Sequence, residues 1–192
     1  MRIIAGRNRG RVLRAPEGAS TRPTAERVRQ ALFDMLWHAP WGGRTVVQDQ
    51  LVLDAFAGTG ALGLEALSRG ASHATFFEID RPALAALRAN IGACKEEPRT
   101  AVLAADVTRP PRARVPCGLV FLDPPYGQGL LPKAVNRLDA AGWIAPGALL
   151  IAETGLDETL ELPGFEAVVS RSHGAATLHV LRAPGARAED VP

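Results

Sequence analysis

The chain has 192 residues, and hydrophobic residues make up 47% of its composition. This length and composition predict one globular domain with a full core, and no apolar run approaches the length of a membrane span. The N-terminus lacks the apolar segment of a signal peptide, and the two cysteines, Cys94 and Cys117, have no metal-ligand spacing. These features favour a cytoplasmic protein without a disulfide framework.

Charge is distributed unevenly along the chain. Residues 1 to 30 contain eight arginines and two glutamates, a local charge of +6, whereas the rest carries 14 basic and 18 acidic residues, or −4. A basic segment joined to an acidic body is typical of an enzyme that binds an anionic polymer. A solvated basic surface without a ligand is the alternative.

The first predicted elements carry these arginines. Residues 2 to 5 and 11 to 14 are apolar runs around a turn with two glycines, which predicts a β-hairpin. Thr24 can cap a helix in which apolar residues recur at helical spacing. We expect residues 1 to 45 to form a basic extension, residues 46 to 183 the body, and residues 184 to 192 a flexible tail.

Residues 51 to 63 predict a buried strand, a glycine turn and the start of a helix. The strand ends at Asp54, and Gly58, Gly60 and Gly63 follow in the G-x-G-x-x-G spacing. Glycine leaves the backbone open to a ligand, and the free N–H groups of the following helix face the turn. A nucleotide-like cofactor is therefore expected here.

The residues around this turn favour S-adenosylmethionine over NAD. Asp54 would repel the pyrophosphate of a dinucleotide, whereas it complements the ammonium and sulfonium groups of S-adenosylmethionine. Glu78 follows Gly58 by twenty residues, at the end of the next apolar run, where an acceptor for ribose hydroxyls is usual. That spacing fits either cofactor. A turn in which Asp54 only caps and the glycines only pack is the remaining alternative.

Helices and strands alternate through the rest of the chain. Asp80 begins a helix that has Pro82 in its first turn. The other expected elements are a helix at about 61 to 69, strands at 73 to 79, 101 to 105, 118 to 122 and 148 to 152, a helix around 130 to 141, and a closing hairpin-like pair at 165 to 171 and 175 to 181. This order predicts an α/β fold with a parallel sheet covered by helices on both faces.

The fourth strand ends in the tetrapeptide Asp123, Pro124, Pro125 and Tyr126. The carboxyl ends of strands in an open α/β sheet face the ligand crevice, so the tetrapeptide should face Asp54. The Asp123 carboxylate and the Pro124 carbonyl can accept both N–H groups of an exocyclic base amine and favour its pyramidal form. The Tyr126 ring can stack on the base. A Pro-Pro turn with a capping aspartate and a core tyrosine is the alternative without function.

Two sets of motifs resemble a known family. The glycine turn, taken with the tetrapeptide, is similar to amino-directed class I S-adenosylmethionine methyltransferases. The N-terminal Arg-Ile-Ile-Ala-Gly-Arg-Asn-Arg-Gly-Arg, the block Arg-Pro-Thr-Ala-Glu-Arg-Val-Arg and the stretch Gly-Ala-Leu-Gly-Leu-Glu-Ala-Leu-Ser-Arg resemble the RsmD family of bacterial 16S rRNA guanine-N2 methyltransferases. The resemblance runs from residue 1 to about 182. Gly127, Gln128 and Gly129 depart from it, because basic residues are expected there.

The resemblance implies a Rossmann-like, doubly wound, mostly parallel seven-stranded sheet with a C-terminal antiparallel strand and a small N-terminal hairpin and helix extension that binds RNA. It implies a monomer that methylates the 2-amino group of a guanine in small-subunit ribosomal RNA, without metal or membrane. The implied cofactor-binding residues are Asp54, Phe56, Gly58, Gly60, Glu78, Ile79, Asp106 and Val107. The implied base-binding residues are Asp123, Pro124 and Tyr126, and the RNA contacts are Arg7, Arg9, Arg11, Arg22, Arg27 and Arg29.

Three other functions stay open. An amino-methyltransferase that acts on adenine or cytosine shares the tetrapeptide, although 192 residues leave little room for the target-recognition region of a DNA enzyme. An NAD-dependent oxidoreductase uses the glycine turn but leaves the tetrapeptide unexplained. A non-catalytic RNA-binding module needs neither site.

Overall fold

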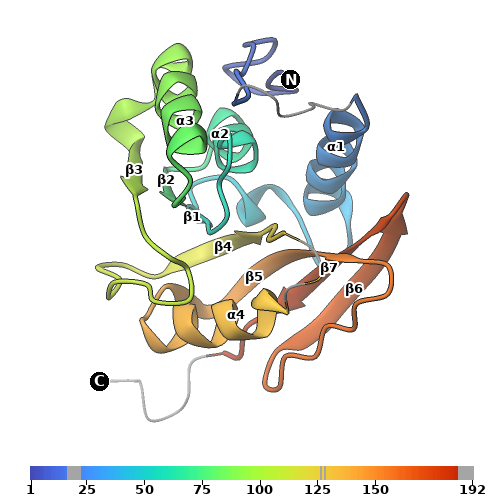
Figure 1. Ribbon diagram of the computed structural model, residues 1–192. Helices are drawn as coiled ribbons and strands as arrows, with labels where there is room; N and C mark the ends of the chain where they lie inside the picture. The colour runs from blue at the N-terminus through green and yellow to red at the C-terminus, as the bar shows by residue number, and fades with distance from the viewer. Residues whose placement is uncertain (17–22, 126, 128, 186–192) are drawn as a thin grey trace.

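A seven-stranded sheet with helices on both faces forms the centre of the molecule (Figure 1). The computed structural model describes residues 1–16, 23–125, 127 and 129–185, with residues 23–25 described by their backbone alone. The strands are β1 (Leu51–Asp54), β2 (His73–Phe77), β3 (Thr100–Leu103), β4 (Cys117–Leu122), β5 (Ile144–Gly155), β6 (Glu166–His173) and β7 (Ala176–Arg182). The helices are α1 (Pro23–His38), α2 (Ala61–Ser68), α3 (Arg81–Cys94) and α4 (Leu130–Ala140), with 3-10 turns η1 (Arg44–Val46) and η2 (Glu97–Arg99).

The strand order, β3-β2-β1-β4-β5-β7-β6, confirms the predicted α/β architecture. The first five strands pair in parallel, whereas β7 runs antiparallel to both β5 and β6. β1 lies between β2 and β4, so the carboxyl ends of these three strands meet at one edge. Residues that follow these strands therefore share a site.

Two hydrophobic clusters, one on each face, hold the sheet. Residues of α1, α2 and α3 pack with alternate strand residues in the first cluster, and those of α4 pack in the second. Both faces of β1 and β4 are covered, which explains their nearly unbroken apolar sequences. The predicted start of α3 is confirmed, because the Asp80 side chain accepts the N–H of Ala83 at 2.9 Å.

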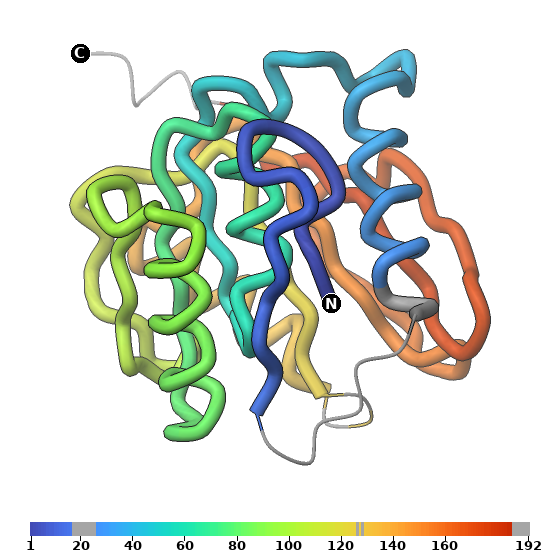
Figure 2. Tube along the Cα trace, turned by 90° about the horizontal axis from the view of Figure 1, so that it is seen from above, coloured from blue at the N-terminus to red at the C-terminus, as the bar shows by residue number. Residues whose placement is uncertain are grey.

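The N-terminal arm, residues 1 to 16, folds back on itself over a shorter stretch than the predicted hairpin. In the described part of the chain it has one antiparallel bridge, between Arg2 and Val12, flanked by backbone hydrogen bonds from Ile3 to Arg11 and from Leu13 to Met1, both 2.9 Å long. The backbone N–H groups of Ile4 and Ala5 donate to the Glu65 carboxylate in α2, at 2.8 and 3.0 Å. These two bonds help to hold the arm on α2, between α1 and α3 (Figure 2).

Apolar side chains of the arm belong to the core of the body. Ile3 and Leu13 are buried in the same cluster as Leu64 and Leu67 of α2. Gly6 has a φ of 79°, and a Cβ there would stand 1.8 Å from the backbone oxygen of Ser68. The arm is therefore packed closely against α2.

No helix in the described ranges is long and apolar enough to cross a membrane.

Candidate functional site

The glycine turn has the geometry that its sequence predicts. Gly58 and Gly60 have φ values of 52° and 78°, in the left-handed region that favours glycine. A Cβ on Gly60 would stand 2.4 Å from Leu87, and one on Gly63 would stand 2.4 Å from Phe76, so these two glycines allow α2 to pack closely. Gly58 has open space at the corresponding position, which leaves its backbone accessible to a ligand.

Asp54 lies at the end of β1 and is 2% exposed. Its Oδ2 accepts the N–H of Gly63 in the first turn of α2 at 3.0 Å. Burial raises the pKa of Asp54 to about 7; the Gly63 N–H opposes the rise and the charge of Glu78 adds to it. A buried carboxylate of this kind is stabilised by a positively charged ligand.

The Glu78 carboxylate joins the two loops beside it through hydrogen bonds. Its Oε2 accepts the N–H of Gly58 at 2.7 Å, and its Oε1 accepts the N–H groups of Ile79 and Asp80 at 2.7 and 2.8 Å. The carboxylate thus holds the glycine turn against the end of β2. Ile79, which follows it, is 66% exposed and offers an apolar surface at this edge.

Asp106 stabilises the turn after β3. Its Oδ1 accepts both the N–H and the hydroxyl of Thr108 at 2.8 Å, and its Oδ2 lies 3.3 Å from the Arg109 Nε. These bonds lower the pKa of Asp106, with the Thr108 N–H as the largest cause. Val107 is buried in the second cluster. The roles of these two residues toward a cofactor stay predictions.

Asp123 and Pro124 follow β4 directly, as the sequence predicts, and Tyr126 lies outside the described residues. Pro124 is buried, whereas the Asp123 residue is exposed. Protein atoms around the Asp123 carboxylate desolvate it in part, and with the charges of Glu153 and Asp54 they raise its pKa. The two strand-end aspartates therefore lie close enough to influence each other.

One cavity of about 570 Å³ brings part of the predicted site together. Asp54, Phe56, Gly58 and Asp123 line it, whereas Gly60, Glu78, Ile79, Asp106, Val107 and Pro124 do not. Its other walls come from α1, from the end of β5 and from the turn between β6 and β7. The cavity thus joins the glycine turn to the end of β4, as expected for two ligands that meet.

Glu153 and His173 line the same cavity and were not predicted as site residues. Glu153 follows Ala152, the partner of Leu122 at the end of β4, so this third acid stands inside β5 at the level of Asp123. An acid directly after a predicted apolar strand could have been recognised from the sequence as a site residue. His173 stands at the end of β6, and no sequence pattern marked it.

The six arginines predicted to bind RNA differ in their surroundings. Arg9, Arg11 and Arg27 are exposed, as the prediction requires, and Arg22 lies outside the described residues. Arg7 is exposed as well, but it pairs with buried Glu96, through Nε at 3.0 Å and Nη2 at 2.9 Å. This pair fastens the arm to the end of α3.

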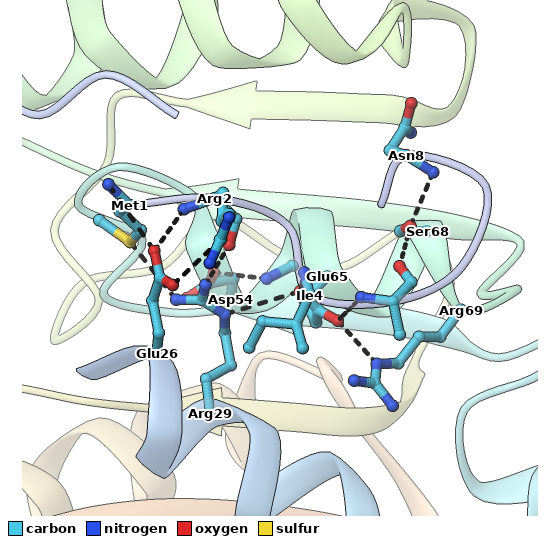
Figure 3. Close-up of polar contacts among 12 residues, drawn as sticks. Met1, Arg2, Ile4, Asn8, Glu26, Arg29, Asp54, Glu65, Ser68 and Arg69 are labelled. Atoms are coloured by element: carbon cyan, nitrogen blue, oxygen red, sulfur yellow. Dashed lines mark hydrogen bonds and ion pairs between the residues drawn. The ribbon is translucent and has the colours of Figure 1, made fainter. Parts of the chain in front are cut away.

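Arg29, which the sequence predicts as an RNA contact, is buried. It is 4% exposed, and its Nη2 donates to the backbone oxygen of Arg2 at 2.5 Å. Its Nε lies 3.6 Å from the Glu65 carboxylate, and Figure 3 shows the side chain reaching from α1 toward the arm. The charge pattern placed it with the basic residues, but its apolar neighbours in α1 face the core.

Fold and site together define a class of protein. The strand order with an antiparallel β7, the glycine turn after β1 and the Asp-Pro-Pro sequence after β4 are those of a class I methyltransferase.

Comparisons with known proteins identify the family. Residues 1–182 match the family described as Conserved hypothetical protein 95. Ribosomal RNA small subunit methyltransferase D of Escherichia coli (strain K12) is 41% identical over 160 residues, which cover 83% of this chain and 77% of that protein. The protein of the same name from Haemophilus influenzae is 36% identical over 167 residues, or 85% and 83% of the two chains. The solved structure of Escherichia coli yhhF has a TM-score of 0.82 and 35% identity, covering 97% of this chain and 99% of that one.

The chain belongs to this family, which confirms the resemblance found in its motifs.

Proposed function

We propose that this protein transfers a methyl group from S-adenosylmethionine to the 2-amino group of a guanine in the RNA of the small ribosomal subunit. The relatives from Escherichia coli and Haemophilus influenzae are named as small-subunit ribosomal RNA methyltransferases, which supports the substrate. The observation that carries the reaction is the single cavity lined by Asp54, Gly58 and Asp123.

The residues of the glycine turn fit this cofactor, which supplies an electrophilic methyl group when bound. Gly58 leaves open space beside its backbone, and the buried carboxylate of Asp54 complements a positively charged ligand. Each Glu78 oxygen already accepts backbone N–H groups, and a carboxylate has capacity for ribose hydroxyls as well. We assign the adenine to the edge formed by Ile79, Asp106 and Val107.

Asp123 and Pro124 hold the target amine in this proposal. The amide-like nitrogen of guanine is a weak nucleophile, and two acceptors fixed on its N–H groups favour the geometry in which its lone pair can react. The nitrogen loses a proton when it gains the methyl group. Asp123 is placed to take that proton, and its raised pKa suits this role. The Tyr126 ring provides the stacking surface for the base.

Exposed arginines of the arm and α1 bind the RNA backbone in this proposal. Arg9, Arg11 and Arg27 extend into solvent, so they can approach phosphates without losing a protein partner. Arg7 instead holds the arm to Glu96 after α3, and Arg29 joins α1 to the arm and to α2. The proposed RNA contact surface thus includes fewer arginines than the charge pattern predicts.

The test compares three substrates: small ribosomal subunits from cells lacking the protein, naked 16S rRNA, and duplex DNA. We expect 2-methylguanine in RNA, detected by mass spectrometry of nucleosides, with the wild type and almost none with Asp123→Asn. Methylation of adenine or cytosine, or of DNA in preference to RNA, would contradict the assignment. The two RNA substrates together show whether assembly of the subunit is required.

A further inference from the structure

More acidic than basic side chains line the cavity. Three acids, Asp54, Asp123 and Glu153, line it. In the described part of the chain, Arg29 is the one lining side chain with a permanent positive charge, and the N-terminal ammonium of Met1, which also lines the cavity, lies 3.8 Å from Glu26. Arg29 lies in α1, whereas the three acids lie in or directly after β1, β4 and β5, so different elements bring charges of opposite sign to the cavity.

The charge of Arg29 is only partly balanced by the protein. Buried Glu65 is closer to Arg69, whose Nε donates to it at 2.7 Å and whose guanidinium also stacks on the Phe33 ring at 4.8 Å. The Arg29 Nε stands 3.6 Å from Glu65 and is buried without a hydrogen-bond partner. Two guanidinium groups therefore share one buried carboxylate, and Arg29 has the weaker contact.

The other carboxylate near Arg29 has partners of its own. Glu26 accepts the backbone N–H of Arg2 at 2.8 Å and lies 3.5 Å from the Arg2 guanidinium (Figure 3). The outer nitrogens of Arg29 contact neutral groups, since Nη1 donates to the Met1 sulfur at 3.4 Å and Nη2 to the Arg2 backbone oxygen at 2.5 Å. A buried cation without a close anion of its own is costly. The cavity wall at Arg29 is thus suited to an anionic group of a bound ligand.

We propose that Arg29 binds the carboxylate of the methionine part of the cofactor, while Asp54 binds its ammonium group. This assignment rests on the proposed cofactor, whose amino-acid end carries these two groups. Arg29 is too deeply buried to contact a backbone phosphate while the rest of the RNA stays outside. A charged hydrogen bond to a carboxylate gives both affinity and a fixed orientation.

The test measures binding rather than turnover. S-adenosylhomocysteine is compared by calorimetry with S-adenosyl-3-thiopropylamine, which keeps the ammonium but lacks the carboxylate. We expect the wild type to prefer the first ligand by about 10- to 100-fold, and Arg29→Met to lose this preference while binding the second ligand as before. Arg69→Met is the matched control, because it removes the other partner of Glu65 outside the cavity, and should keep the preference.

Three results would overturn the assignment. The wild type could bind both ligands equally. This result needs no variant, so it would overturn the assignment even where Arg29→Met fails to fold. Arg29→Met could weaken both ligands by the same factor, which would give Arg29 a structural role alone. It could also keep the preference and lose RNA affinity, which would return it to the RNA surface. Absence of S-adenosylhomocysteine binding to the wild type would instead contradict the proposed cofactor.

Discussion

Replacing Asp54 by Asn tests whether the buried carboxylate of Asp54 lowers the stability of the folded protein. Its pKa rises from 3.8 in an exposed aspartate to about 7 in the folded protein. The corresponding free energy has a ceiling of about 4 kcal/mol, because one pKa unit is worth about 1.4 kcal/mol. New amide N–H groups at a site beside the cavity cost about 1–2 kcal/mol. We therefore expect the variant to gain about 2 kcal/mol near neutral pH.

The sign of the pH dependence follows from the raised pKa. Between about pH 4 and pH 7 the unfolded chain has lost the Asp54 proton while the folded chain keeps it, so the wild type loses stability as pH rises through this window. Above about pH 7 the loss is complete and constant. Urea unfolding of both proteins at several pH values measures the difference, since groups remote from Asp54 titrate alike in both. A stability difference that stays the same from about pH 4 to pH 8 would refute the reasoning.

The same substitution should weaken the cofactor site. The amide keeps an acceptor for the Gly63 N–H but carries no charge for the ligand ammonium. We expect calorimetry to show a loss of about 1.5–3 kcal/mol in affinity for S-adenosylhomocysteine. The wild-type affinity should also fall below about pH 7, as Asp54 takes up its proton, whereas the variant should lack this dependence. Higher stability with lower affinity is the pattern of a residue retained for function.

Three further variants test other parts of the molecule. Gly6→Ala should lose about 1–3 kcal/mol more in urea unfolding than Gly10→Ala, because both have positive φ but only the first meets α2 backbone; equal losses would argue against the packed arm. Asp123→Asn should lower kcat at least about tenfold with nearly unchanged calorimetric affinity for S-adenosylhomocysteine; lost affinity at normal kcat would move Asp123 to the cofactor. Replacing Arg9 and Arg27 by Gln should flatten the logarithmic salt dependence of RNA binding by somewhat under two units in filter assays; an unchanged slope would remove them from the interface.

The sequence predicts best what depends on neighbours along the chain. Apolar runs covered on both faces mark the central strands, and an acid directly after a strand marks the site edge, so Asp54 and Asp123 are found from position alone. The glycine spacing likewise predicts the positive φ of Gly60. These features are fixed by local backbone geometry and by the parallel sheet.

Partners that are distant in the chain could not be predicted. Arg7 meets Glu96 and Arg29 meets Glu65, and in each case the sequence shows a basic residue without showing which acid it will contact. The same holds for the short hairpin, because the sequence does not show that the N–H groups of Ile4 and Ala5 donate to Glu65 of α2. Charge counting therefore finds a basic segment but not which of its arginines face solvent.

α2 serves both the arm and the cavity, which makes the two interdependent. Gly63 in its first turn donates to Asp54, Glu65 accepts two arm N–H groups, and the Ser68 hydroxyl accepts the N–H of Asn8 at 3.0 Å. A helix of eight residues has little stability of its own, so contacts at its end help to fix its start.

An arm that acted only as an RNA-binding extension could be loosened without effect on the cofactor. The shared helix predicts otherwise: Gly6→Ala, which displaces the arm from α2, should lower S-adenosylhomocysteine affinity as well as RNA affinity. Gly10→Ala carries a similar backbone strain, with nothing within 4 Å of its added Cβ, and should leave cofactor affinity near that of the wild type. Calorimetry on the two variants separates these cases. Equal and unchanged cofactor affinity in both would mean that α2 holds the glycine turn without help from the arm.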